Sequence, residues 1–154
     1  MNNCGLESRL SPIAGQGLFT TQPWPKGSQL TPYLGKLLHM PPAADTPGQP
    51  TYLLEISPSV WLDGDTPQNL ARFANHACAP NTELIHNAIT GLTWLVAQRD
   101  LAPNEEITFD YGLSLADSLF HPCRCGSPIC VGRILATPLR QRLRRHLRFS
   151  RRRD

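Results

Sequence analysis

Short apolar runs separated by turn-forming residues make up most of the chain and predict a protein built mainly from short strands. The segments at 51–56 (TYLLEI) and 60–63 (VWLD) are typical of two strands joined by a tight turn. A strand rich in large apolar residues is predicted at 91–101, and apolar and polar positions alternate at 107–112 (ITFDYG). Residues 6–38 are predicted to form further short strands, because glycines and prolines interrupt them repeatedly.

A longer helical pattern is confined to the last part of the chain. From Thr137 we predict a helix, with Thr137 as its N-cap, Pro138 at the first helical position, and leucines on one face at 139, 143 and 147. This leucine face could dock on the rest of the protein or pair with a partner helix. Shorter helical turns are expected at 69–74 and 113–120, and a Pro-rich loop is expected at 40–50.

Composition supports one modest domain of mainly β structure. The chain has 154 residues, and its 15 prolines and 11 glycines leave little room for long helices. No apolar run approaches the roughly 18 residues of a membrane span, and the first ten residues lack the apolar segment of a signal peptide. We therefore expect a cytoplasmic protein by default, with the nucleus, export to another cell and the oligomeric state left open.

Charge divides the chain into an acidic body and a basic end. Residues 1–136 carry seven Lys and Arg against eleven Asp and Glu, a net charge of −4, whereas residues 137–154 carry eight Arg against one Asp, a net charge of +7. The body should therefore favour a cationic partner. The arginine-rich end could bind the phosphates of a nucleic acid, fold back on the acidic body, or remain solvated.

Three cysteines lie within eight residues and indicate a metal site. Cys123, Cys125 and Cys130 form C-x-C-x4-C in a turn-rich segment, and a structural zinc ion takes four ligands. The fourth ligand could be Cys78, in the unusual stretch NHACAPN at 75–81, or Cys4, and His76 is a competitor. A set of reduced thiols without metal is the alternative.

Several blocks together resemble the SET-domain protein lysine methyltransferases. They are AGQGL (14–18), YLG (33–35), RFANHACAPN (72–81), EEITFDYG (105–112) and the cysteine-rich run CRCGSPICVG (123–132), which is similar to the post-SET segment of that family. The resemblance covers about residues 5–135. It implies a SET domain at 5–112, a post-SET zinc segment at 119–135 and an arginine-rich helix or tail at 137–154.

The resemblance also implies an α+β, mainly β fold and a chemistry. The fold is a β-clip of small curved sheets, in which the N-H-x-C and F-D-Y segments meet in a knot-like crossing. The activity is transfer of a methyl group from S-adenosylmethionine to a lysine ε-amine. One structural zinc ion is implied, with ligands Cys78, Cys123, Cys125 and Cys130.

Individual roles follow by the same likeness. Tyr111 would place its hydroxyl at the methyl-transfer centre, Tyr33 would line the lysine channel, and Phe109 would leave room for di- or trimethylation. Cofactor contacts are implied for Gly15, Gln16, Gly17, Tyr52, Arg72, Phe73, Asn75 and His76. Read from the residues alone, the two glycines are equally well explained as turn residues, Tyr52 by core packing, and Arg72 and Phe73 by a structural role.

Substrate choice is less defined. The acidic body and basic end fit an enzyme that methylates a basic protein, such as a histone or a histone-like protein, with nucleic acid as a further partner and no membrane. The alternative function is a non-catalytic zinc module that binds nucleic acid through its arginine-rich end. Asp110 and Glu106 are interpreted as structural residues beside the site.

Overall fold

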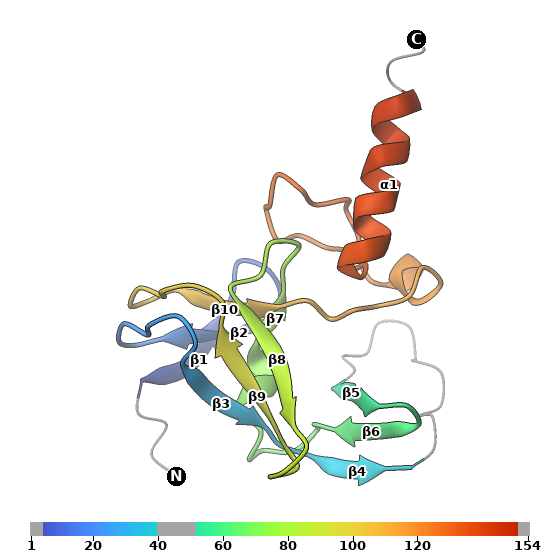
Figure 1. The fold of residues 1–154 in the computed structure, drawn as a ribbon. Helices are drawn as coiled ribbons and strands as arrows, with labels where there is room; N and C mark the ends of the chain where they lie inside the picture. Colours follow the sequence, from blue (N-terminus) through green and yellow to red (C-terminus); the bar gives the residue numbers. More distant parts are fainter. Residues whose placement is uncertain (1–4, 40–51, 151–154) are drawn as a thin grey trace.

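The computed structural model describes residues 5–39 and 52–150, with side chains described up to residue 146. Within these ranges the chain forms ten short strands in three small sheets, two 3-10 turns and one α-helix (Figure 1). The prediction of a mainly β protein with a C-terminal helix is confirmed. The predicted Pro-rich loop at 40–50 lies outside the described residues, as does Cys4.

The first sheet brings the two most characteristic segments of the sequence together. Its strand order is β1-β2-β10-β7, formed by Leu6–Leu10, Gln16–Thr20, Glu106–Phe109 and Asn75–His76. Strands β10 and β7 are parallel, with Thr108 opposite Asn75 and Phe109 opposite His76. The start of NHACAPN therefore lies directly beside Thr108 and Phe109, although 27 residues separate NHACAPN from FDY in the sequence.

The other two sheets are three-stranded and antiparallel. One has the order β3-β9-β8, formed by Gln29–Tyr33, Leu92–Ala97 and Thr82–Asn87; the other has the order β4-β6-β5, formed by Lys36–Leu38, Val60–Asp63 and Leu53–Ser57. Strand β8 was not predicted, because it is an edge strand with polar residues on both faces. The strand predicted at 91–101 is shorter than expected and ends at Ala97.

The core lies where the sheets meet and includes a residue that follows the cysteine cluster. Leu18, Leu95 and Ile107, from β2, β9 and β10, are fully buried. Leu135 is also fully buried, so the segment that carries the cysteines is anchored to the body at its end. The 3-10 turn η1 (Leu70–Phe73) leads into β7, and η2 (Asp117–Phe120) precedes the cysteines.

Helix α1 (Thr137–Ser150) begins where the sequence predicts it, but its N-terminus is capped differently (Figure 1). The carbonyl of Ala136 accepts the first helical hydrogen bond, from the Arg140 amide at 2.9 Å, so Thr137 is the first helical residue and not the N-cap. Asp110 provides the cap instead, because its Oδ2 accepts the Thr137 amide at 2.9 Å. The predicted N-cap was therefore wrong: the carboxylate of Asp110, directly after β10, caps the helix in place of the Thr137 side chain.

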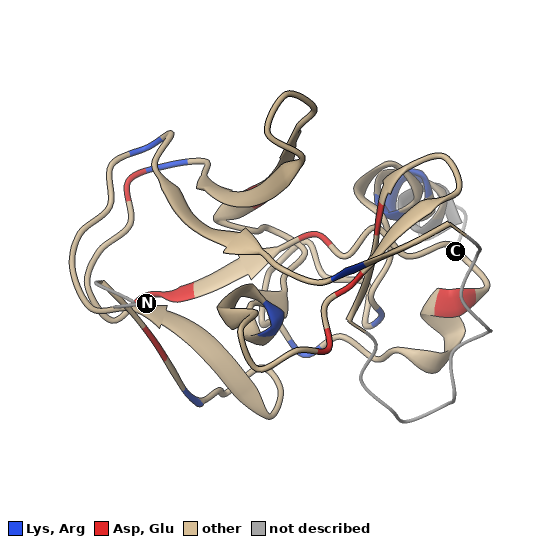
Figure 2. Ribbon diagram, turned by 90° about the horizontal axis from the view of Figure 1, so that it is seen from below, with Lys and Arg blue, Asp and Glu red and all other residues tan. Residues whose placement is uncertain are grey.

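The face of α1 that carries the predicted leucines is only partly covered. Leu139 and Leu143 are half-buried, and the side chain of residue 147 lies outside the described ones. Figure 2 shows acidic positions distributed along the strands and loops of the body, and basic positions both on the body and on α1. Among the described residues, no helix combines the length and apolar character needed to cross a membrane.

Candidate active site and metal centre

A cavity of about 650 Å³ lies beside β7 and β10. Its wall includes nine of the residues to which the sequence assigned catalytic or cofactor roles: Gly15, Gln16, Tyr33, Tyr52, Arg72, Phe73, Asn75, Phe109 and Tyr111. Gly17 and His76 do not line it. Phe120, His121 and Pro122, just before the cysteines, complete the wall on another side.

The phenolic groups of Tyr111 and Tyr33 are neutral hydrogen-bond donors. Tyr111 donates from its hydroxyl to the carbonyl of Ala74 at 3.0 Å, and Tyr33 donates to the carbonyl of Tyr52 at 2.8 Å. Burial raises the pKa of both Tyr111 and Tyr33 well above the ordinary value, because the phenolate would lose its hydration. The Phe109 ring packs 4.8 Å from the Tyr111 ring, measured between centroids.

His76 supports Tyr111 from behind the cavity. Its Nδ1 accepts the Tyr111 amide at 3.2 Å, and the two rings make an edge contact with centroids 5.5 Å apart. Burial, helped by the positive charge of Arg140, lowers the pKa of His76 to about 4, so the ring is neutral and its proton is on Nε2. Nε2 faces the Cys78 sulfur at 3.7 Å.

The Asn75 side chain holds the loop that forms the cavity rim. Its Nδ2 lies within 3.1 Å of the carbonyls of Ala14 and Gln16, and 2.8 Å from Glu106 Oε1. Glu106 is fixed in turn by the hydroxyl of Ser11, which donates to it at 2.6 Å. Glu106 is thus structural, as interpreted from the sequence, and the Asn75 amide contributes by positioning residues 14–16.

The two glycines of AGQGL have different reasons to be glycine. A Cβ at Gly17 would lie 2.6 Å from Glu106 Oε1 and 2.9 Å from the Ser11 Cβ, so close packing behind the rim requires glycine. Gly15 has a φ of +46°, and an added Cβ would meet no described atom within 4 Å. Gly15 therefore leaves the backbone open to the cavity, whereas Gly17 packs inside the rim.

Arg72 lies between two aromatic rings of the wall. Its guanidinium is 4.9 Å from the Phe73 centroid and 5.6 Å from the Tyr52 centroid, and it pairs with Asp65 at 3.2 Å. Its Nε is buried and has no hydrogen-bond partner among the described residues. An acceptor supplied by a bound molecule would satisfy this donor.

Four cysteines form a cluster that fits a tetrahedral metal ion. The sulfurs of Cys78, Cys123, Cys125 and Cys130 all lie within 4.8 Å of one another, and those of Cys78 and Cys123 are 3.9 Å apart. A tetrahedral zinc site with Zn–S bonds of about 2.3 Å places its sulfurs roughly 3.8 Å apart. Geometry thus supports the expected ligand set, including Cys78 as the member from mid-chain.

Backbone amides around the cluster favour thiolate sulfur. The amide of Cys78 donates to Cys125 Sγ at 3.4 Å, and that of Gly132 donates to Cys130 Sγ at 3.3 Å. Burial alone would raise the pKa of Cys125, but donors from Cys78 and Ser127 lower it to about 7. Burial instead raises the pKa of the Cys78 and Cys123 thiols, so these two would become thiolates on binding a metal ion.

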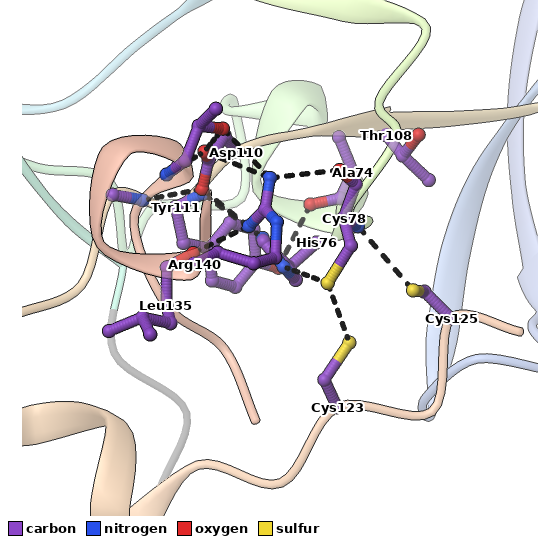
Figure 3. Close-up of polar contacts among 12 residues, drawn as sticks. Ala74, His76, Cys78, Thr108, Asp110, Tyr111, Cys123, Cys125, Leu135 and Arg140 are labelled. Carbon is purple, nitrogen blue, oxygen red and sulfur yellow. Dashed lines mark hydrogen bonds and ion pairs between the residues drawn. The ribbon is translucent and has the colours of Figure 1, made fainter. Parts of the chain in front are cut away.

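Asp110, which the sequence analysis interpreted as structural, and Arg140, to which it assigned no role, both support the site. Asp110 caps α1, and Arg140 is almost fully buried, with its guanidinium 2.8 Å from the Cys78 carbonyl (Figure 3). Asp110 follows β10 in a recognisable motif, so its position carried some signal. Arg140 belongs to a run of arginines that all look alike in the sequence.

A small β fold with a phenol-lined cavity beside a four-thiol centre defines the class of protein. The SET domain family matches residues 15–112, so the chain belongs to the SET-domain family and the predicted resemblance is confirmed. Histone-lysine N-methyltransferase ash1 of Drosophila melanogaster is 31% identical over 137 residues, covering 83% of this chain and 6% of that protein.

Further relatives support the same assignment. A histone-lysine N-methyltransferase, H3 lysine-4 specific, of Schizosaccharomyces pombe is 32% identical over 126 residues, covering 75% of this chain and 14% of that protein. The crystal structure of KRYPTONITE in complex with mCHH DNA, H3(1-15) peptide and SAH is similar with a TM-score of 0.67 and 28% identity, covering 84% of this chain and 29% of that one. The chain thus spans less than a third of each of these relatives.

Proposed function

We propose that the chain is a protein lysine methyltransferase that uses S-adenosylmethionine. The observation that carries the proposal is the buried, neutral Tyr111 hydroxyl, held on the Ala74 carbonyl in a cavity whose rim is the Gly15 loop. The SAH and H3 peptide in the KRYPTONITE complex support this assignment. Bound S-adenosylmethionine would supply the sulfonium methyl group for in-line displacement.

The residues of the cavity would prepare a lysine amine as the nucleophile. A free lysine has a pKa of about 10.4, so only about 0.1% is neutral at pH 7.4. Desolvation in the cavity beside Tyr33 and Phe109 and the positive charge of the bound cofactor's sulfonium would both disfavour the charged ammonium. Tyr111, which stays protonated, orients the amine through its hydroxyl oxygen and cannot act as a strong base. Catalysis then rests on positioning.

Zinc would be held by Cys78, Cys123, Cys125 and Cys130 and would act structurally. Because Phe120, His121 and Pro122 line the cavity immediately before Cys123, fixing the cysteine segment also fixes that wall. The ion would have four sulfur ligands and no open position, as in structural zinc sites. It contributes the shape of the cavity and not a chemical step.

The finer part of the proposal concerns substrate and product. A net charge of −4 on residues 1–136 supports a basic protein substrate, histone or histone-like. Phe109 has no hydroxyl to hold a water beside the amine, which supports di- or trimethylation. Arg145 is exposed on α1 and supports nucleic acid as an additional partner.

The proposal is tested by transfer of tritium from labelled S-adenosylmethionine to a histone mixture. Wild type should label the substrate, Tyr111→Phe should not, and Leu10→Ala, changed at an exposed position on β1, should match wild type. Calorimetry should show cofactor binding by all three. Label that survives in Tyr111→Phe would contradict the role of that residue. A wild-type protein that neither binds the cofactor nor transfers label, yet binds nucleic acid, would favour the non-catalytic alternative.

A further inference from the structure

Arg140 is a buried cation at the start of an otherwise solvent-facing basic helix. Its exposed fraction is 2%, whereas Arg142 and Arg145 on the same helix are exposed. Its guanidinium donates to the carbonyl of Leu135 at 2.5 Å, the carbonyl of Cys78 at 2.8 Å and the hydroxyl of Thr137 at 2.8 Å. It also lies 3.7 Å from Asp110 Oδ2 (Figure 3).

These acceptors come from separate parts of the chain. Cys78 lies two residues after β7, Leu135 ends the cysteine segment, and Asp110 directly follows β10. A buried guanidinium is strongly unfavourable unless its charge and its donors are satisfied, so this group is stable only while the three parts keep their relative positions. Lysine would replace it only in part, because an ammonium lacks the planar fork that reaches several acceptors at once.

The carboxylate beside Arg140 holds the backbone on both sides of Tyr111. Asp110 Oδ1 accepts the amide of Gly112 at 3.1 Å, and Oδ2 accepts the amide of Thr137 at 2.9 Å. Tyr111 lies between Asp110 and Gly112, and its own amide donates to His76 Nδ1. Without the Arg140 charge, Asp110 would be held less firmly, and so would the backbone around Tyr111.

The hydrogen bond from Arg140 to the Cys78 carbonyl bears on the Tyr111 side chain through the chain around β7. Cys78 lies four residues after Ala74, whose carbonyl accepts the Tyr111 hydroxyl. Arg140 therefore restrains the chain just after β7 through the Cys78 carbonyl and the chain just after β10 through Asp110. Tyr111 follows β10 and its acceptor Ala74 precedes β7, and these two strands pair in parallel.

Resting on the methyltransferase function proposed above, we propose that Arg140 is a positioning residue for the Tyr111 hydroxyl. It touches neither the cavity wall nor the reacting groups, and it acts through Asp110 and the Cys78 carbonyl. A misplacement of a catalytic group by about 1 Å can cost roughly a hundredfold in rate. The role also explains why one arginine of the basic segment is turned inward.

The test compares Arg140→Met and Arg140→Lys with Arg142→Met, a matched change at an exposed arginine of the same helix. We expect Arg140→Met to lower kcat by about 10- to 100-fold while the Kd for S-adenosylmethionine and the zinc content stay within about twofold of wild type. Arg140→Lys should fall between, because an ammonium keeps the Asp110 charge pair but not all the carbonyl bonds. Arg142→Met should match wild type.

A readout that does not need turnover accompanies the kinetics. In protein labelled with 13C-tyrosine, the Tyr111 ring signal, assigned with Tyr111→Phe, should shift in Arg140→Met and stay in place in Arg142→Met. An unchanged signal together with unchanged kcat would overturn the inference. So would loss of zinc, cofactor binding and kcat together, which marks a general structural role. If wild type transfers no methyl group, the function proposed above fails, and the Tyr111 signal alone decides the role of Arg140.

Discussion

Replacement of Asn81 by alanine should destabilise the protein strongly without touching the cavity. Asn81 is the last residue of NHACAPN and is 4% exposed. Its Oδ1 accepts the amide of Thr108 at 2.8 Å, and its Nδ2 donates to the carbonyl of Glu106 at 2.8 Å. Both partners belong to β10, so one side chain joins the metal-bearing segment to the strand that precedes Tyr111.

The expected loss follows from the two backbone groups that alanine leaves unpaired. Each unsatisfied buried group costs about 1–3 kcal/mol, so the free energy of unfolding should fall by about 2–6 kcal/mol. A loss of about 3 kcal/mol lowers the Tm of a domain of this size by roughly 6–12 °C. A second contact, from Nδ2 to Glu105 at 2.9 Å, adds less because Glu105 is partly exposed and also pairs with Arg99.

Urea denaturation followed by circular dichroism, with zinc present throughout, measures this loss. Asn81→Asp separates the two bonds, because it keeps an acceptor for Thr108 but removes the donor and places a carboxylate beside Glu105. Gln98→Ala, at an exposed position, serves as control and should stay within about 0.5 kcal/mol of wild type. If Asn81→Ala also stayed within that range, the reasoning about buried unpaired groups would be refuted here.

Three further predictions concern the reaction and the metal. Phe109→Tyr should shift the product from di- or trimethyl-lysine toward monomethyl-lysine, because a hydroxyl would be added beside the Tyr111 ring, 4.8 Å away; an unchanged product mixture by mass spectrometry would contradict this. Chelation of zinc should abolish methyl transfer while the circular dichroism of the β-sheets persists, because the cysteines fix the cavity wall at 120–122. Full activity in metal-free protein would exclude a role of zinc in shaping the cavity. The initial rate should rise up to tenfold per pH unit from pH 7, because the substrate amine deprotonates. Ionisation of Tyr111 should cause no fall in the rate, because burial raises the pKa of that phenol. A fall in rate below pH 10 that is assigned to Tyr111 would refute the interpretation.

The local pattern predicted those parts of the fold that local chemistry determines. The strand at 60–63 and the start of α1 follow from apolar runs and from a proline at an early helical position. The four-sulfur cluster was also predictable, because three of its members lie within eight residues and Cys78 lies in a specific motif. Strand β8 was not predicted, because this edge strand mixes polar and apolar residues on both faces and so has no distinct period.

Contacts between distant segments could not be predicted in this way. Arg140 is separated from Cys78 by 62 residues, and nothing in an arginine run marks the member that will be buried. The cap on α1 passed from Thr137 to Asp110 for the same reason, since the acceptor comes from another element. Gly17 looked like a cofactor glycine, yet its neighbours Ser11 and Glu106 are what exclude a side chain there.

The separation of the cysteines along the chain sets an order of events during synthesis. Cys78 precedes Cys123 by 45 residues, which a ribosome adding roughly 5–20 residues per second covers in about 2–9 s. Throughout that interval Cys78 has been synthesised but its three partner cysteines have not. Without metal, the three sheets could therefore form while the cavity wall at 120–122 is not yet held in place.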